Sequence, residues 1–290
     1  MNRLYPSLTL TLTALTLVPN IAEAAVFSAS GEDPASIQAT VDAFRTASGE
    51  PNNGNQIGPI QGGRRQIDWD GRPGAAAPFD MPGDFFNAVV PRGSVYETPG
   101  SGFQISGADG DPNNNDPIED FGNINPTYTE VFEPFSAEKL FTTVDSNILD
   151  ILFFLPGTDT AATVSSFGAV FSDVDLPETS KMEFFDVKGN LIQTNFVEAV
   201  ANRNESFSFL GVTFDDSIVS RVRITSGNAA LGENTFEGNG IDLVVLDDFI
   251  YSEPQVAERV PEPSSLLTML LVGTLAWFPK QKLRKFPWMK

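Results

Sequence analysis

The chain has 290 residues with no cysteine and no histidine, and its formal net charge at pH 7 is −20. These absences exclude disulfides, thiolate nucleophiles, Ser-His-Asp catalysis and histidine-ligated zinc. Residues 25–259 carry 36 acidic and 12 basic side chains, and the resulting charge of −24 argues against nucleic acid as a partner because it repels phosphate backbones. Such a surface keeps a protein soluble, and it also suits hard cations such as calcium, which prefer carboxylate oxygens.

The first 24 residues have the pattern of a secretory signal peptide. Arg3 supplies the positive charge, an apolar run covers residues 8–18, and Ala22 and Ala24 place small residues where signal peptidase cuts. The alternative is an N-terminal anchor, but the apolar run is too short for a helix that spans a membrane. We therefore expect export across the inner membrane, with signal peptidase as a processing partner.

Residues 25–127 are expected to form a short helix followed by a loop-rich layer that packs on the core. The helix is predicted from Asp33 to about Thr46, because Pro34 suits a first helical turn and apolar residues recur at helical spacing. Ser30 or Asp33 could serve as its N-cap. The stretch that follows is dense in Gly, Pro, Asn and Asp, which permits disorder. Its tryptophan and phenylalanine content favours an ordered, irregular layer instead.

Trp69 is the only tryptophan outside the C-terminal tail, and polar side chains flank it, among them Arg65 and Asp70. Its ring could stack on a sugar while the neighbouring arginine and aspartate form hydrogen bonds with the sugar hydroxyls. The alternative is more common for a lone tryptophan in such a segment: the ring fixes the loop to the core.

The densest acidic loop runs from Asp109 to Asp120. Its oxygen-bearing side chains alternate along the chain, so that a tight turn could aim every second one at a single cation, as in a calcium loop. These candidate ligands are Asp109, Asp111, Asn113, Asn115 and Asp120. Asn114 stands where an EF-hand requires glycine, and no flanking helices are predicted. The alternative is a solvated turn without a metal.

Residues 128–259 are expected to form a β-sandwich core. Short strands separated by turn residues are predicted at 148–155, 166–171, 181–187, 191–200, 206–214, 219–225 and 241–251. Lys188-Gly189-Asn190 indicates a hairpin, and the alternation around Arg221 and Arg223 places both arginines on one face of a strand. The fold class that this pattern predicts is mainly β, a jelly-roll-like sandwich with a short N-terminal helix.

Further acidic side chains in this core are candidate ligands for a structural calcium ion. They are Asp173 with Asp175, the pair Asp215-Asp216, and the pair Asp247-Asp248. Neighbours on a regular strand face opposite ways, so at most one of Asp247 and Asp248 should point at a given site. The alternative is that these acids cap turns and keep sheet edges soluble.

The C-terminal residues 260–290 have three parts in order. Pro261-Glu262-Pro263 comes first, an apolar stretch that predicts a hydrophobic helix covers residues 266–278, and a basic cluster follows. By the positive-inside rule the basic cluster stays in the cytoplasm while the preceding domain lies across the membrane. The alternative interpretation is a simple single-pass anchor, which also places the domain outside the cytoplasm.

This tail resembles a PEP-CTERM sorting tail. The resemblance implies cleavage near Pro261–Pro263 by an exosortase-type membrane protease, a Gram-negative-type envelope, and an association with exopolysaccharide or biofilm. Two features depart from the pattern: the apolar stretch is short for a membrane span, and the residues after the basic cluster are longer than a typical stub. The core, from Phe121 to Phe249, also resembles domains of unassigned function in other exported bacterial proteins.

The sequence therefore predicts an exported, non-catalytic protein of the cell surface or extracellular matrix that binds polysaccharide, with calcium as a possible structural ion. One alternative is a structural component of the envelope or biofilm without a discrete ligand. Another is a glycoside hydrolase, because two suitably placed carboxylates suffice for that chemistry.

Overall fold

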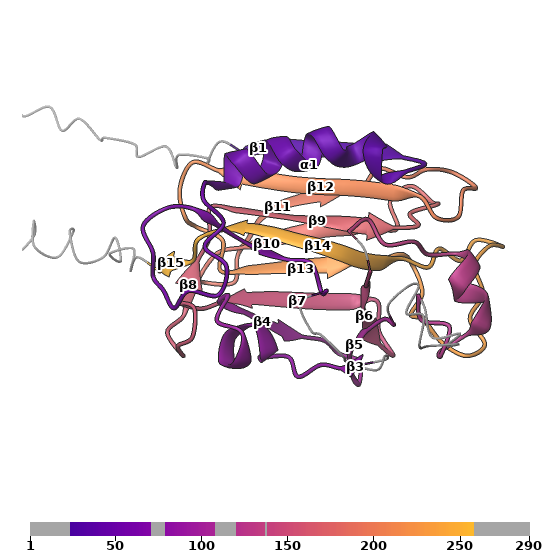
Figure 1. Ribbon diagram of the computed structural model, residues 1–290. Coiled ribbons are helices and arrows are strands. Elements are labelled where there is room, and N and C mark those ends of the chain that lie inside the picture. Colours follow the sequence, from indigo (N-terminus) through magenta and orange to yellow (C-terminus); the bar gives the residue numbers. More distant parts are fainter. Residues whose placement is uncertain (1–23, 71–78, 108–119, 137, 258–290) are drawn as a thin grey trace, which may run out of the picture. The chain divides into compact units, whose positions relative to one another are not determined.

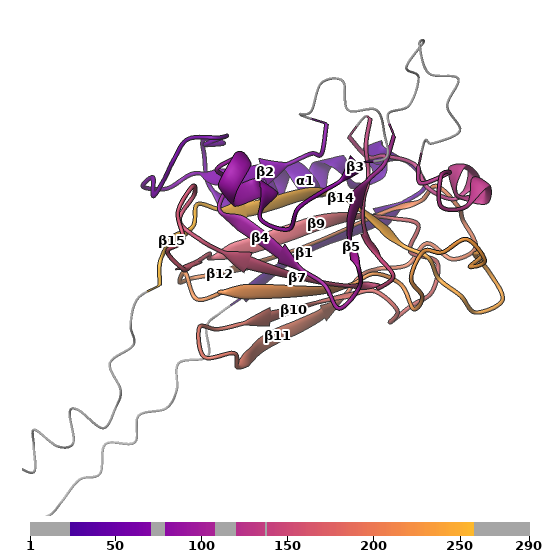
Figure 2. The same ribbon diagram turned by 90° about the horizontal axis from the view of Figure 1, so that it is seen from below.

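The computed structural model describes residues 24–70, 79–107, 120–136 and 138–257. They are mainly β, in two antiparallel sheets that form two layers (Figures 1 and 2). The first sheet contains β1 (Ala24–Gly31), β12 (Phe207–Phe214), β9 (Ser166–Ser172), β14 (Val245–Ser252), β6 (Phe141–Val144), β5 (Gly102–Ile105) and β3 (Phe79–Asp80) in spatial order, and β2 (Arg64–Ile67) pairs with β14. The second contains β11 (Leu191–Phe196), β10 (Lys181–Phe185), β13 (Arg221–Thr225), β7 (Ile148–Phe153) and β4 (Ser94–Glu97). A small ribbon pairs β15 (Gln255–Val256) with β8 (Ala162–Thr163).

The main core lies between the two sheets. Burial alternates along β10 and β13 of the second sheet, so that in β10 Met182 and Phe184 are fully buried while Lys181 and Glu183 are partly exposed on the outer face. Buried residues of β9, β12 and β14 in the first sheet belong to the same apolar cluster. This burial of alternate residues from both inner faces is what holds two sheets together as a sandwich.

The N-terminal helix, α1 (Pro34–Ser48), covers the outer face of the first sheet (Figure 1). The prediction of this helix is confirmed, and Asp33 is its cap: the carboxylate accepts the backbone N–H of Ser36 at 2.8 Å. The apolar stripe packs on β9 and β12, and the Phe44 ring lies over a glycine from each strand. β1 pairs with β12 and begins at Ala24, the residue after which signal peptidase is predicted to cut.

Most strand predictions are confirmed to within a few residues, including the β10–β11 hairpin and the arginine face of β13. Two details differ. The last long strand begins at Val245 rather than Ile241, because residues 226–244 form a long connection. The loop-rich layer also supplies strands to both sheets, namely β2, β3 and β5 to the first and β4 to the second, and a further strand, β1, precedes the helix.

Two short helical turns complete the fold: η1 (Phe85–Val89), a π-helical turn, and η2 (Pro126–Glu130), a 3-10 turn. Among the described residues, no helix is both long and apolar enough to cross a membrane. Residues 1–23 of the predicted signal peptide, among them Ala22, lie outside the described residues. The whole predicted tail, residues 260–290 with Pro261, Glu262 and Pro263, also lies outside them.

Candidate metal centre

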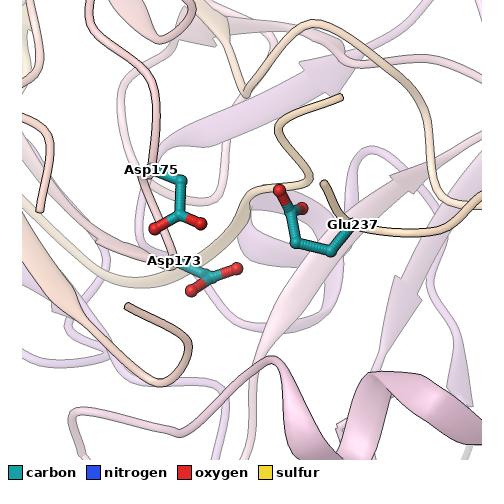
Figure 3. Close-up of side chains that lie close together, drawn as sticks. All are labelled: Asp173, Asp175 and Glu237. Carbon is teal, nitrogen blue, oxygen red and sulfur yellow. The ribbon is translucent and has the colours of Figure 1, made fainter. Parts of the chain in front are cut away.

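Three carboxylates meet at one end of the first sheet. Asp173 directly follows β9, Asp175 lies two residues further on, and Glu237 comes from the connection between β13 and β14. An oxygen from each lies within 4.8 Å of an oxygen of the other two, and Figure 3 shows the three side chains converging. At a calcium–oxygen distance of about 2.4 Å, two ligand atoms can be at most about 4.8 Å apart. The separation therefore suits one shared cation.

Asp173 is the most unusual member of this cluster. Its side chain is 0 % exposed, and neither carboxylate oxygen has a hydrogen-bond partner. Burial first, and then the charges of Asp175 and Glu237, raise the pKa of Asp173 to about 9. A buried carboxylate without a partner costs several kcal/mol when charged, on the order of 2–7 even for a neutral polar group. A bound cation would remove that cost.

The backbone holds Asp173 in this position. Its φ angle is +70°, in the left-handed region that is uncommon for residues other than glycine. Its N–H donates to the carbonyl of Ser206 at 2.8 Å, at the start of β12. The turn out of β9 is thereby tied to the neighbouring strand, so the carboxylate points at the cluster instead of at solvent.

Glu237 lies on a loop that other residues fix. Tyr128 of η2 donates its hydroxyl proton toward the carbonyls of Gly232 and Thr235, and the Asn125 amide reaches the carbonyls of Glu233 and Thr235. The Glu237 carboxylate accepts the N–H groups of Gly238 at 3.0 Å and Leu243 at 2.7 Å. Burial is the main cause that raises the pKa of Glu237 to about 7.

Asp175 is oriented by a fourth acid, Asp242. The N–H of Asp175 donates to Asp242 Oδ1 at 2.9 Å, and the hydroxyl of Thr179 donates to the other oxygen of Asp242. Asp175 in turn accepts the N–H of Arg203 at 3.1 Å. Asp242 is fully buried, and burial raises its pKa.

No arginine or lysine neutralises this centre within the described residues. The ion pairs formed by the described residues involve acids outside the centre, such as Asp150, Glu253 and Asp248. With neither histidine nor cysteine in the chain, every available side-chain ligand is an oxygen atom. Oxygen ligands and a high local negative charge favour a hard divalent cation, and calcium tolerates the irregular geometry of loop ligands. The residues present therefore fit a calcium ion.

The sequence was compared with family models and with curated proteins. Neither comparison gives a match. The interpretation of this centre consequently depends on its geometry.

The structure brings together one of the predicted acid pairs, Asp173 with Asp175, and adds Glu237, which sequence reasoning missed. Glu237 lies far along the chain from the other two, in a Gly- and Asn-rich connection. A single acid between Phe236 and Gly238 is only a weak sequence signal for a metal ligand. The tertiary fold is what places Glu237 opposite Asp173.

Four candidate ligands of the predicted calcium loop lie outside the described residues: Asp109, Asp111, Asn113 and Asn115. Asp120 is described; it is buried with a φ angle of +47° and is not a member of the cluster. Asp215 and Asp216 are exposed after the end of β12 and do not belong to the cluster either.

Asp247 and Asp248 correct the expectation that at most one of them points at a given site. Between Leu246 and Phe249, β14 holds one more residue than its partner β9, a β-bulge. Both carboxylates consequently reach the same hydroxyl, that of Ser136, at 3.1 and 3.0 Å.

These two acids form hydrogen bonds and an ion pair within the protein, and neither belongs to the metal cluster. Asp247 accepts the N–H groups of Phe135 and Ser136, and Asp248 pairs with Arg45 at 2.7 Å. Burial raises the pKa of both, to about 6 for Asp248, whose pKa the Arg45 charge holds down.

The sugar-stacking hypothesis for Trp69 is wrong, because the ring is only 2 % exposed. It stacks on Phe141 with ring centroids 4.2 Å apart, and its N–H donates to the carbonyl of Asp247. Arg65 is fully buried and forms a bidentate pair with Glu253 at 2.5 and 2.7 Å, so it cannot reach a surface ligand.

Asp70 is likewise engaged with the protein itself, since it accepts the N–H groups of Glu138 and Lys139. Burial raises its pKa to about 6. The three residues fix the loop-rich layer to the core, which is the alternative that the sequence left open.

A separate hollow of about 260 Å³ lies at the other end of the first sheet. Serines, glycines and glutamines line much of it, and its lining includes Ser165, Ser252 and Glu253. Its carboxylate is already paired with Arg65, so it offers no unneutralised charge. The cluster at Asp173 is therefore the stronger candidate for a binding site.

Proposed function

We propose that this chain is an exported, non-catalytic protein that binds calcium at Asp173, Asp175 and Glu237 and acts at the cell surface or in the extracellular matrix by binding polysaccharide. The observation that carries the proposal is the Asp173 carboxylate, fully buried with both oxygens unpartnered and two further acids facing it. Asp175 and Glu237 are only half-buried, which leaves the ion a route from solvent.

The register of the sheet separates the candidate calcium centre from the two ends of the described core. Ala24 pairs with Phe214 at one end of β12, whereas Phe207, at the other end, pairs with Ser172, the residue before Asp173. Gln255, close to the last described residue, pairs with Thr163 at the same end as Ala24. Seven strand residues separate the two ends by about 20 Å. The candidate calcium centre therefore lies at the end of the sheet away from both Ala24 and Gln255.

The strand pairing supports a jelly-roll connectivity, in which a long hairpin of eight strands is rolled into two sheets. Taken in chain order, β6 pairs with β14, β7 with β13, β9 with β12, and β10 with β11, so the first strand pairs with the last and the middle two with each other. Lectin domains are among the proteins built on jelly rolls. This fold-level analogy favours a saccharide ligand.

A binding role is favoured over hydrolysis by the burial of Asp173. A general acid or nucleophile must touch its substrate. The carboxylate with the most displaced pKa in this centre is fully enclosed by protein, where it could hold an ion but could not reach a glycosidic bond. An ion bound there has a structural and ligand-presenting role.

The test is calorimetric titration of calcium into a fragment of residues 25–257, which contains both sheets and the whole described core. We expect one site that raises the melting temperature on binding, with a dissociation constant on the order of 0.1–1 mM, as in extracellular calcium modules. Asp173→Asn should abolish both effects.

Asp216→Asn is the matched control, because Asp216 is an exposed acid outside the cluster and its loss changes the net charge equally. If the two variants bind calcium alike, the ion is held elsewhere or only by diffuse charge, and the proposed centre is wrong.

A further inference from the structure

We infer that the loop of residues 232–240 is a saccharide-binding subsite, in which the Phe236 ring stacks on a sugar and the calcium ion beside it accepts sugar hydroxyls as ligands. The inference rests on the proposed calcium centre and names where its ligand binds. Its occupant is a neutral polysaccharide with vicinal hydroxyl groups.

The exposure of Phe236 is the first observation. The chain contains 24 phenylalanines, and among the residues whose exposure is described only two aromatic side chains rank as exposed, Phe236 at 52 % and Phe196 at 49 %. A solvent-exposed phenyl ring lacks the favourable free energy that a buried phenylalanine side chain contributes to folding. Phe196 lies on β11, at the edge of the second sheet, whereas Phe236 directly precedes a ligand of the metal centre.

The second observation is that the loop is held in place on both sides of Phe236. Tyr128 and Asn125 bind the carbonyl of Thr235, the residue before it, as described above. After it, Gly238 and Ile241 pair across a tight turn, and the amide of Asn228 donates to the carbonyl of Gly240 at 2.8 Å. A fixed loop loses little conformational entropy on binding, which favours a preformed ligand site.

The third observation is that Phe236 directly precedes Glu237 in the chain. Phe236 and Glu237 are neighbours, with Cα atoms about 3.8 Å apart, so a ring stacked on Phe236 lies within one or two sugar units of the carboxylate. Calcium takes six to eight oxygen ligands. Asp173, Asp175 and Glu237 leave positions that water or hydroxyl groups can fill. A sugar offers both an apolar face for the ring and hydroxyl oxygens for the ion.

Charge decides the kind of polysaccharide. Residues 25–259 have a formal charge of −24, and Glu233, Glu205 and Asp242 are close to the loop or the centre. A polyuronate would meet repulsion over most of this surface. A neutral polymer avoids that repulsion and still binds the cation through its hydroxyl groups.

The experiment measures binding of the 25–257 fragment to immobilised mannan and dextran, with alginate as the anionic comparison, in calcium and in EDTA. We expect saturable binding to a neutral polymer that EDTA abolishes and that exceeds binding to alginate. Phe236→Ala should weaken this binding about tenfold or more, as for an exposed aromatic anchor, while the calcium affinity in calorimetry stays within twofold. Phe236→Tyr should retain binding.

Phe196→Ala is the matched control, because it removes an equally exposed ring from a different place, and it should change binding less than twofold.

Several outcomes would contradict the inference. If Phe236→Ala binds both calcium and the polymer normally, the subsite is wrong and the calcium centre is intact; the serine-lined hollow would then be the next candidate. Absence of polymer binding would also overturn the subsite, and absence of calcium binding would overturn both proposals. A dimer in sedimentation that Phe236→Ala dissociates would assign the ring to a contact between copies, against the inference.

Discussion

Buried carboxylates of this protein fall into two kinds, distinguished by what surrounds them. Glu253 is enclosed by Arg65, the Asn53 amide and the N–H of Ile60, so that its charge is fully satisfied. Asp173 is just as buried but has no hydrogen-bond donor at either oxygen. The first arrangement leaves no uncompensated charge in the interior. The second is stable only when protonated or bound to a cation, which is why Asp173 indicates a site.

The pH dependence of stability follows from these raised pKa values. Asp173 has a folded pKa of about 9 and Glu237 of about 7, both above the unfolded values. At pH values between the unfolded pKa and the folded pKa of each group, the folded state binds more protons than the unfolded state. The free energy of unfolding therefore falls as pH rises through this range. Solvent screens the half-buried Glu237, so we take the Asp173 carboxylate alone and expect in EDTA a loss of about 1 kcal/mol per pH unit between pH 6 and 8, measured by urea denaturation.

Calcium should reverse part of this trend, because the ion replaces the protons. We expect its affinity to rise over the same pH range, and the loss of stability to be smaller in saturating calcium. Asp173→Asn serves as the control, since it should reduce the slope seen in EDTA. A stability in EDTA that is flat or rises with pH would contradict the assignment.

At the scale of elements, the contact between α1 and the first sheet depends on a pair of glycines. Gly168 of β9 and Gly211 of β12 face each other in register, and the Phe44 ring of α1 lies over both. A Cβ atom at Gly211 would lie 2.6 and 2.7 Å from ring atoms of Phe44, and one at Gly168 would lie 2.7 Å away. Neither contact is tolerable without movement. The absence of two side chains therefore makes room for the helix.

Gly211→Ala should consequently destabilise the fold by about 1–3 kcal/mol, the usual cost of overpacking a well-packed core. Urea denaturation of the 25–257 fragment measures this difference. In a double-mutant cycle, Phe44→Leu in the Gly211→Ala background should recover part of the loss, because the smaller side chain leaves space for the new methyl group. Strictly additive effects would show that the two residues do not compete for space.

At the scale of the whole molecule, strand register places the two ends of the described core far from the candidate metal centre. Ala24 and Gln255 lie at one end, and Asp173 lies at the other, through the register of β1, β12 and β9. A protein arranged in this way can be processed at both termini without disturbing the loops that carry the metal ligands.

Processing at the N-terminus gives a direct prediction. Cleavage after Ala24 would leave Ala25–Gly31 paired with β12, whereas cleavage further along would remove part of that edge strand. We expect the exported protein to begin at Ala25, as intact-mass measurement and N-terminal sequencing of secreted material would show. Secreted material that keeps residues 1–24, or that begins in the middle of β1, would contradict the predicted signal peptide.

The sequence by itself determined the features that depend on local order. Asp33-Pro34 and the spacing of apolar residues specify α1, and Lys188-Gly189-Asn190 specifies the β10–β11 hairpin, because capping, helical periodicity and tight turns each involve only neighbouring residues. The absence of cysteine and histidine likewise excluded whole classes of chemistry without reference to the fold.

The tertiary structure decided which side chains meet. Asp173 and Asp175 were candidates from the sequence, but Glu237 joined them only through the β13–β14 connection. Trp69 had polar neighbours along the chain and still lies inside the core, because its segment folds onto β6 and β14. Contacts between segments distant in sequence depend on how the sheets close around the core, and no local pattern records that closure.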